Sequence, residues 1–530
     1  MQKRLKYKSP GSISVKRPLI SFLLLLSLAI FNFGQAPTGT QAPAAAATSA
    51  APAKQAYEVP FVNKTLANGL EVIVLPDSGV PLVTVELAVR NGSFTEPPEL
   101  NGLSHLYEHM FFKSNQAILL GQCENAARNF VSGPRCVDSA RLKAKIGDVS
   151  YLANIGSLGI SYNGETREEV VQYYFTTTSP YVDTAIRFIN DAVRYPLFEE
   201  NEFDREKQVV LGEIDRNESS PGFYLNNAMT EKLFFKYPTR KTPLGTRETV
   251  ATATTDKMRL IESRYYVPNN SALVVTGNVN PDEVFKTVER IMGTWERRPI
   301  DPFKEFPLVE HPPLSKSEAV IIQQPIDSQS VLIEIGWQGP SIGKDDKATY
   351  AADVFSYILT QPDSRFQRNL VDTGLVTAVS FGYYTQRNVG PINLVLSTTP
   401  EKAKAALKAV YAEIAQFGKP DYFTKEELET SKTLLGANDL YDREKSDEYA
   451  HTLAFWWSST GVDYFRGYQK NLNATTREDL NRYVNTYIVG KPHVGLALLA
   501  PDAKAKANLA DIHLGQVRRL RDFRRGRART

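Results

Sequence analysis

Residues 65–114 read TLANGLEVIVLPDSGVPLVTVELAVRNGSFTEPPELNGLSHLYEHMFFKS, and this stretch sets the expected fold. The pair Asn68-Gly69 is a turn signal between two strand-like runs. The runs LEVIVL and LVTVELAV follow it, and we interpret them as strands. Helical patterns come next, including one at residues 199–216. Strands and long helices in this mixture predict an α+β fold.

The same stretch carries an H-x-x-E-H motif, formed by His105, Glu108 and His109. On a helix, positions i and i+4 share a face, so both imidazoles can bind one metal ion. Glu108 lies close to that face, where its carboxylate can reach a water molecule that the ion holds. The motif is the inverse of the H-E-x-x-H peptidase helix, and it predicts a zinc site with Glu108 as the general base. The alternative is a solvated or structural histidine pair.

A catalytic zinc site needs a third protein ligand and leaves its fourth position to water. The helical pattern at residues 199–216 carries Glu202, Glu206 and Glu213. Glu206 and Glu213 are seven residues apart, so they lie on one face of a helix. One can bind the metal while the other orients a ligand, and the periodicity alone does not say which. An ordinary exposed carboxylate is the alternative for each.

The chain contains an internal repeat. EVIV at Val72 pairs with AVII at Val320 with an offset of 248, and Thr254…Tyr266 pairs with Thr475…Tyr487 with an offset of 221. The offsets differ by 27, so the first copy holds about 27 extra residues between these points. A Pro-rich stretch near residues 298–316 separates the copies. We therefore expect two related halves.

Cys123 and Cys136 are the two cysteines of the chain, and both lie inside the inferred insertion. Residues 1–36 combine a basic start with an apolar run, which is typical of an export signal. An uncleaved membrane anchor is the alternative. In an exported protein the two cysteines are expected to form one local disulfide.

Charge is unevenly distributed along the 530 residues. The net charge is +3, but residues 1–36 carry +6 and residues 512–530 another +6, which leaves about −9 for the region between them. A mildly acidic body argues against nucleic acid as the main partner. The length predicts two or more domains.

Several segments together resemble the pitrilysin/insulysin family of inverted-motif zinc peptidases, in its two-domain bacterial form related to mitochondrial processing peptidase. They are residues 65–114, YNGETREEVVQYYF (162–175), YPLFEENEFDREKQVVLGEI (195–214) and YYVPNNSALVVTGNVNPDE (265–283). The resemblance implies two homologous αβ-roll domains, each an antiparallel or mixed sheet with flanking helices, joined by a Pro-rich linker. It also implies one Zn²⁺ per chain and hydrolysis of peptides or unfolded polypeptides.

The resemblance assigns roles to individual residues. It makes Glu213 the third zinc ligand, beside His105 and His109, and Glu206 a supporting carboxylate of the catalytic machinery. The gap from His109 to Glu213 is 104 residues, longer than is usual in the family, and the inferred insertion accounts for the excess. Asn163 falls on a strand that contacts substrate in the family, although a turn-forming role before Gly164 is an equal alternative.

The second half lacks the motif, because Asp353 stands where the repeat places His105. It also departs from the family at an Arg–Tyr pair that contacts substrate, since the aligned positions are Leu370 and Thr377. A homodimer, or a heterodimer with a family subunit that carries this pair, is therefore an equal alternative to a chain that works alone. Two alternatives to a self-sufficient enzyme are a non-catalytic or partner-dependent subunit and a surface module that binds anionic polymers through its Arg-rich tail.

The expected organisation has six parts. They are a signal peptide (1–36), a flexible linker (37–56), an N-terminal zinc peptidase domain (57–300), an interdomain linker (301–316), an inactive homologous domain (317–511) and a basic tail (512–530). We expect an exported protein, periplasmic in preference to secreted or anchored, with no stable membrane span once the signal is removed.

Overall fold

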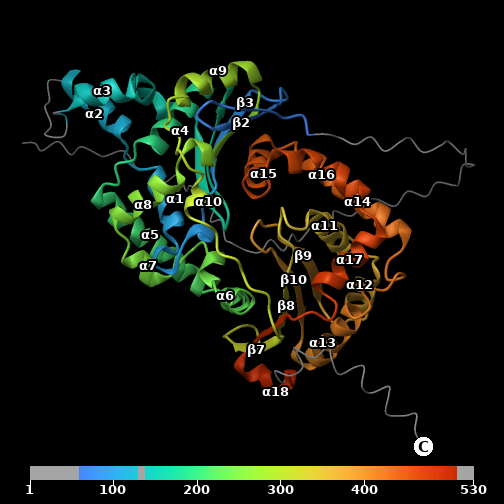
Figure 1. Ribbon diagram of the computed structural model, residues 1–530. Coiled ribbons are helices and arrows are strands. Elements are labelled where there is room, and N and C mark those ends of the chain that lie inside the picture. Colours follow the sequence, from blue (N-terminus) through green and yellow to red (C-terminus); the bar gives the residue numbers. More distant parts are fainter. Residues whose placement is uncertain (1–58, 129–135, 137, 510–530) are drawn as a thin grey trace, which may run out of the picture. The chain divides into compact units, whose positions relative to one another are not determined.

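The computed structural model describes residues 59–128, 136 and 138–509 (Figure 1). The predicted signal peptide, the linker that follows it and the basic tail at 512–530 lie outside these residues. Within the described part of the chain, no helix is both long and apolar enough to cross a membrane.

Two β-sheets organise the described chain. The first has the order β1-β2-β6-β3-β5-β4 and the second the order β7-β11-β8-β10-β9. The strands of the first sheet are β1 (Val62–Thr65), β2 (Glu71–Pro76), β3 (Leu82–Val89), β4 (Ser161–Thr166), β5 (Val171–Thr178) and β6 (Ser271–Gly277). Those of the second are β7 (Glu318–Gln323), β8 (Val331–Gln338), β9 (Ala378–Tyr383), β10 (Pro391–Thr398) and β11 (Val494–Leu499).

The internal repeat is visible in this topology. Apart from β1, the two sheets follow the same plan, with one parallel pair (β2 with β6, β7 with β11) and antiparallel pairing elsewhere. Val72 lies on β2 and Val320 on β7, as the offset of 248 requires. The predicted α+β architecture with two related sheets is confirmed.

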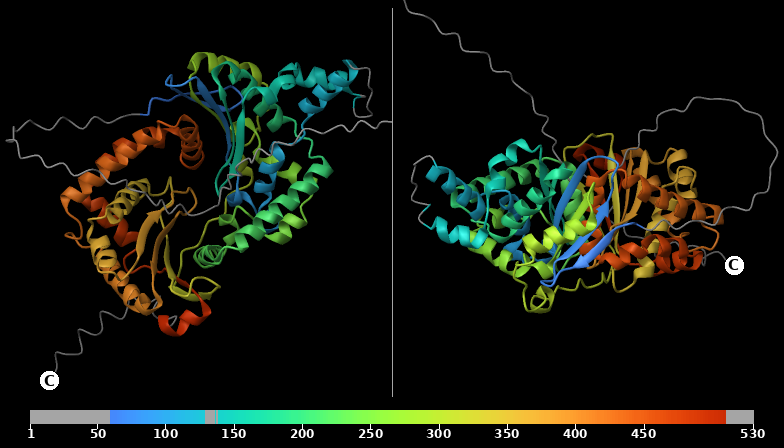
Figure 2. Two further views of the ribbon diagram at one scale, coloured as in Figure 1. Left: turned by 180° about the vertical axis from the view of Figure 1, so that it is seen from behind. Right: turned by 90° about the horizontal axis from the view of Figure 1, so that it is seen from above.

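Helices flank both sheets (Figures 1 and 2). Those before the second sheet are α1 (Leu103–Phe111), α2 (Gln116–Arg128), α3 (Ser139–Ile146), α4 (Val182–Arg194), α5 (Glu200–Glu218), α6 (Pro221–Leu233), α7 (Arg247–Ala251), α8 (Thr255–Tyr265), α9 (Pro281–Met292) and α10 (Pro302–Glu305). Those after its first strands are α11 (Asp346–Thr360), α12 (Arg365–Gln367), α13 (Pro400–Ile414), α14 (Lys425–Asp442), α15 (Ser446–Ser459), α16 (Val462–Ala474), α17 (Arg477–Tyr487) and α18 (Lys504–Ala507).

Strand alternation divides the apolar residues of the first sheet between two cores. Val72 and Val74 of β2 face the core that contains α1, α4, α5, α8 and α9, whereas Ile73 and Leu75 face a separate cluster. Successive side chains on a strand point to opposite faces, so both faces of this sheet are covered. The face toward α1 is the one that positions the site.

Each half contributes a helix that packs on the sheet of the other half. Leu453, Trp457 and other apolar residues of α15, from the second half, cover the second face of the first sheet. Reciprocally, Leu225, Met229 and Leu233 of α6, from the first half, pack on β11 and β7 of the second sheet. Figure 1 shows α15 beside β3, and α6 beside β8.

Polar contacts accompany this packing. His451 of α15 lies 2.5 Å from the buried carboxylate of Glu86 on β3. Glu169 accepts the backbone N–H groups of Arg387 and Asn388, at 2.8 and 3.0 Å. The segment expected as an interdomain linker, 301–316, contains the short helix α10 and ends near the start of β7.

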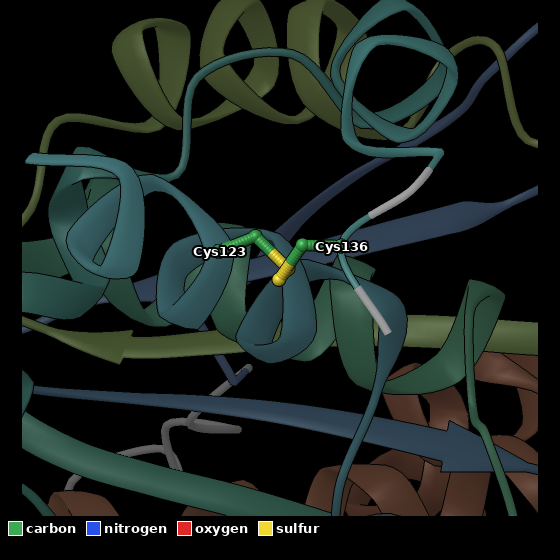
Figure 3. Close-up of a disulfide and its surroundings, with 2 residues drawn as sticks. All are labelled: Cys123 and Cys136. Atoms are coloured by element: carbon green, nitrogen blue, oxygen red, sulfur yellow. A yellow bond between two sulfur atoms is a disulfide. The ribbon is translucent and has the colours of Figure 1, made fainter. Parts of the chain in front are cut away.

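The predicted insertion follows α1 and contains α2 and α3. We call this segment the excursion. Cys123 of α2 is joined to Cys136 by a disulfide (Figure 3). A satellite cluster of Ala117, Leu120 and Val149, with Leu142 of α3 packed against it, holds the excursion together. This cluster is separate from the main core of the first half.

Candidate metal centre

Helix α1 begins at a tightly packed turn. Gly102 has a φ of 86°, and a Cβ there would lie 2.6 Å from the Cα of Gly245, so this position accepts only glycine. The carboxylate of Glu96 accepts the backbone N–H groups of Gly102 and Ser104, at 2.7 and 2.6 Å. Glu96 therefore satisfies N–H groups at the start of α1 that have no partner within the helix.

The periodicity of α1 separates its core face from its chemical face. Leu103, Leu106, Tyr107, Met110 and Phe111 are buried in the main core of the first half. His105 and His109 lie on the remaining face, which is turned toward α5, and Glu108 is turned toward β4. The i, i+4 spacing of the two histidines accounts for their shared face, whereas the contact of Glu108 with β4 depends on the packing of the sheet on α1.

His105, His109 and Glu213 come together although 104 residues separate the second from the third. Oε2 of Glu213 lies 3.5 Å from Nε2 of His105 and 3.7 Å from Nε2 of His109. Around a tetrahedral Zn²⁺ with bonds of about 2.0–2.2 Å, ligand atoms lie about 3.4 Å apart. Within residues 59–128, 136 and 138–509, this trio is the one group of three metal-binding side chains whose ligand atoms all lie within 4.8 Å. The donor set fits zinc in type and spacing.

Glu206 lies behind this trio and not within it. Its Oε2 is 3.2 Å from Nδ1 of His109, the ring nitrogen turned away from Glu213, and its Oε1 is 2.6 Å from Nζ of Lys113. A carboxylate on the outer nitrogen of a metal-binding histidine fixes the ring orientation and the tautomer. The geometry therefore separates the two carboxylates that helix periodicity left equivalent: Glu213 faces both histidines, and Glu206 positions one of them.

The three side chains of the trio influence one another's ionisation. Burial alone would lower the pKa of His109, but hydrogen bonds to Glu206 and Glu213 raise it to about 9. Burial, reinforced by the charge of His109, lowers the pKa of His105 to about 4. At Glu213 the contacts with the two histidines outweigh burial and hold the pKa below its ordinary value. His105 as a neutral imidazole and Glu213 as a carboxylate are therefore in the forms that bind metal, whereas His109 must release a proton to do so.

The side chain of Glu108, on α1, is buried against β4. The hydroxyl of Thr166 donates a hydrogen bond to its Oε2 at 3.0 Å. Gly164 faces the same carboxylate, and a Cβ there would lie 2.6 Å from Oε1 and 2.7 Å from Cγ of Glu108. Burial raises the pKa of Glu108 to about 7, against the opposing effects of His109 and Thr166. A carboxyl group with a pKa near neutrality can both accept and release a proton.

The predicted substrate contact Asn163 does not share this face. Residues 164 and 166 of β4 point toward Glu108, so alternation turns the exposed Asn163 to the opposite face of the sheet. β4 is the last strand of its sheet, and its outer edge has no partner strand among the described residues. The strand is therefore at the site, while the side chain of Asn163 is turned away from the trio.

The positions aligned with an Arg–Tyr pair have other roles. Leu370 is fully buried in the core of the second half. Thr377 donates its hydroxyl to the carbonyl of Ser397 at 3.1 Å. Arg368 donates to the carbonyl of Asp363. The position that aligns with the arginine of the pair is therefore occupied by a buried leucine, as the sequence indicates.

Sequence reasoning did not find Glu96, Lys113 or Gly164. Glu96 precedes the helix start by a few residues, and an acidic residue before a helix was the available signal. Lys113 and Gly164 act through neighbours that are distant in the chain, so nothing in their local sequence indicates the contact.

Two family models match much of this chain. Residues 72–120 and 144–247 match the family model described as Insulinase (Peptidase family M16), and residues 252–435 match the one described as Peptidase M16 inactive domain. The match omits residues 121–143, which contain both cysteines.

Curated relatives and solved structures extend over most of the chain. Zinc protease PqqE of Helicobacter pylori is 23% identical over 82% of this chain and 91% of its own length. The zinc protease YmxG of Bacillus subtilis is 24% identical over 72% of this chain and 84% of its own length. The crystal structure of a protease from Helicobacter pylori has a TM-score of 0.69 at 20% identity, and covers 83% of this chain and 99% of its own. A putative M16-like peptidase from Alicyclobacillus acidocaldarius has a TM-score of 0.67 at 19% identity, over 84% and 100%. These two structures show a shared fold.

Proposed function

Because the chain belongs to peptidase family M16, we propose that it is a zinc-dependent endopeptidase that hydrolyses peptides or unfolded polypeptides. The observation that carries the proposal is the trio His105, His109 and Glu213 with the carboxylate of Glu108 beside it. One Zn²⁺ held by the trio would supply a Lewis acid and would lower the pKa of a water molecule.

The residues around the trio transfer the proton, position the catalytic side chains and bind the substrate. Glu108 takes a proton from the attacking water and passes it to the leaving amine, a role that its pKa of about 7 suits. Thr166 holds the carboxylate of Glu108 in place, and Glu206 holds the ring of His109. The open edge of β4 offers backbone groups to which an extended peptide can add as a further strand.

The test compares a variant of the general base with variants of the proposed zinc ligands. Glu108→Gln should keep zinc and lose peptidase activity by about 10²- to 10⁴-fold, because the general base is removed and the ligands are not. His105→Ala and Glu213→Gln should lose zinc as well as activity. Zinc is measured by elemental analysis of the purified protein, and activity by cleavage of casein and of a peptide mixture.

Glu200→Gln is the matched control, because Glu200 is exposed on the same helix as Glu213 and contacts neither histidine. It should retain both zinc and activity. Normal turnover by Glu108→Gln would contradict the proposed mechanism, and normal zinc content in Glu213→Gln would contradict the ligand set.

We also propose that a second subunit completes the enzyme, either another copy or a family member that carries the Arg–Tyr pair. The support is the chain's own second half, where Leu370 is buried and Thr377 is engaged by Ser397. A purified chain that is monomeric by sedimentation and fully active alone would contradict this.

We propose export to the periplasm on the basis of the signal-like residues 1–36 and the disulfide, since disulfides persist in oxidising compartments. Cell fractionation tests this, and recovery of the full-length chain from the cytoplasm with both thiols free would contradict it.

A further inference from the structure

Two adjacent residues that follow α1 bind carboxylates of α5. Nζ of Lys113 lies 2.6 Å from Oε1 of Glu206. The backbone N–H of Ser114 donates to Oε2 of Glu202 at 3.0 Å, and its hydroxyl donates to Oε1 of the same carboxylate at 2.8 Å. Glu202 and Glu206 are four residues apart on α5, so they share a face of that helix. We call these contacts the α1–α5 clamp.

The clamp joins the two helices that carry the proposed zinc ligands. His105 and His109 lie on α1 and Glu213 lies on α5, and the two helices are side by side (Figure 1). Glu213 follows Glu206 by seven residues, two helical turns, so it lies on the same face of α5 as the clamp. Ligand distances in a metal site are set to within about 0.2 Å. A small shift of α5 along α1 would therefore disturb the trio.

Directional contacts are suited to prevent such a shift. Both helices bury apolar residues in the main core of the first half, among them Leu106 of α1 and Val210 of α5. Apolar packing is not directional, and packed helices can slide by small amounts. Hydrogen bonds to ionised groups are short and have a defined geometry. Glu206 also faces Nδ1 of His109 with its second oxygen, so the contact with Lys113 bears on a ligand ring as well as on the helix.

The chain on both sides of the clamp is held in place. Asn115 forms an antiparallel bridge with Pro196, and the N–H of Gln116 donates to the carbonyl of Tyr195 at 2.9 Å. These partners lie in the connection between α4 and α5. The side chain of Glu206 is only 13% exposed, so water screens its ion pair less than it screens a surface pair. The clamp therefore has a fixed base on each helix.

We propose that Lys113 and Ser114 are positioning residues that hold α5 at the distance from α1 that zinc requires, and so raise the zinc affinity of the trio. Neither belongs to the proposed ligand set, and they act through Glu206 and Glu202. This inference rests on the proposed function, because it takes the trio to bind zinc. It deepens that function by assigning part of the zinc affinity to residues outside the trio.

The experiment measures the zinc dissociation constant of the full-length chain by competition with a chelator. Lys113→Met should raise the constant about tenfold, at the lower end of the range for groups that orient metal ligands. Ser114→Ala should raise it about twofold to fivefold, because one of two hydrogen bonds to Glu202 is lost. Lys113→Arg should restore wild-type affinity, since arginine keeps both the charge and the N–H donors.

A double variant tests whether Lys113 acts through Glu206. In the Glu206→Gln background, Lys113→Met should cause no further loss of zinc affinity, because two substitutions that remove the same contact are not additive. A further loss as large as that seen in the wild-type background would overturn the inference.

Lys207→Met is the matched control. Lys207 pairs with Asp204 at 2.9 Å, an ion pair within α5 that cannot set its distance from α1, so this variant should bind zinc as the wild type does. Wild-type zinc affinity in both Lys113→Met and Ser114→Ala, even with lower stability in urea, would overturn the inference. Equal loss of affinity in Lys207→Met would do the same. A wild type that binds zinc but cleaves no peptide would instead count against the proposed function alone, so the two failures are distinguishable.

Discussion

Gly164 shows how closely the edge strand and the catalytic helix pack. The space for a side chain at this position is taken by Oε1 and Cγ of Glu108. Gly164→Ala should therefore displace the carboxylate of Glu108 and lower kcat by about tenfold to a hundredfold, because catalysis is sensitive to displacements near 1 Å. Zinc content should stay normal, since the three atoms nearest to a Cβ at Gly164 all belong to Glu108 and none to the trio.

Gly222→Ala is the control for this substitution. The nearest atom to a Cβ at Gly222, on α6, is Oγ of Ser220 at 3.7 Å, an ordinary contact. It should change neither kcat nor zinc content. Unchanged kcat in Gly164→Ala would mean that Glu108 can reorient without loss of function.

At the scale of single residues, the sequence predicts which side chains share a face of one helix, because this depends only on their spacing. His105, Glu108 and His109 lie within five residues, so helix periodicity alone brings them to one region. Assigning Glu213 required the resemblance to a known family, and Gly164 could not be found. The contact of Glu108 with β4 spans 58 residues and depends on how the sheet packs on α1.

At the scale of elements, the excursion that contains α2 and α3 is stabilised by its disulfide. Replacing both cysteines by serine should make opening of this excursion easier by about 3 kcal/mol, the loop-closure value for a 13-residue separation. Limited proteolysis should then cut within the excursion sooner than in the wild type. Zinc content and peptidase activity should be retained, because the satellite cluster is separate from the main core.

Loss of zinc in the double serine variant would contradict this independence. Wild type treated with a reductant should behave like the variant, which controls for an effect of the serines themselves.

The repeat offsets, which differ by 27, predict the excursion as an insertion, and the family match independently omits residues 121–143. Its helices could not be placed in the same way. The insertion has no counterpart in the second half, so the repeat gives no guide to how it folds.

At the scale of the whole molecule, Glu86 and Glu334 occupy equivalent positions on β3 and β8 but differ in their partners. Glu86 is paired with His451 of α15, which opposes the rise in its pKa that burial causes, although its Oε1 also has no hydrogen-bond partner. Glu334 points to the side of α6, its Oε1 has no hydrogen-bond partner, and burial raises its pKa to about 7. In the unfolded chain the pKa returns to about 4.5.

The sign of the pH effect follows from these values. Between pH 4.5 and 7 the folded protein keeps the proton on Glu334 while the unfolded chain loses it, so stability falls as pH rises, and the cost is complete above pH 7. Glu334→Leu should therefore be more stable than wild type at pH 8, by about 1.4 kcal/mol for each unit of the pKa shift that it removes. The gain should shrink toward pH 5. Urea unfolding of both proteins in chelator, at pH 5 to 8, measures the difference.

Glu86→Leu is the matched control at the equivalent strand position. It removes the carboxylate partner of His451 and should destabilise the protein. An equal stability gain in both variants, or none in Glu334→Leu at pH 8, would contradict the different environments of the two carboxylates.

The sequence predicted the duplication and the α+β class, but it did not predict that a helix of each half packs on the sheet of the other half. Repeat offsets compare each half with the other and contain no information on contacts between them. His451 and Glu86 are 365 residues apart, and nothing near either residue indicates that they meet.

The packing of each half's helix on the other half's sheet limits how the chain can be divided into stable fragments. Each sheet is covered on one face by a helix that the opposite half encodes, so a gene fragment for either half alone would yield a product with a large exposed apolar face. A single nick between residues 301 and 316 would leave both pieces associated, since their packing does not depend on the peptide bonds there. Two genes expressed together could replace the one, and recombination between relatives would have to exchange both halves' interfaces at once.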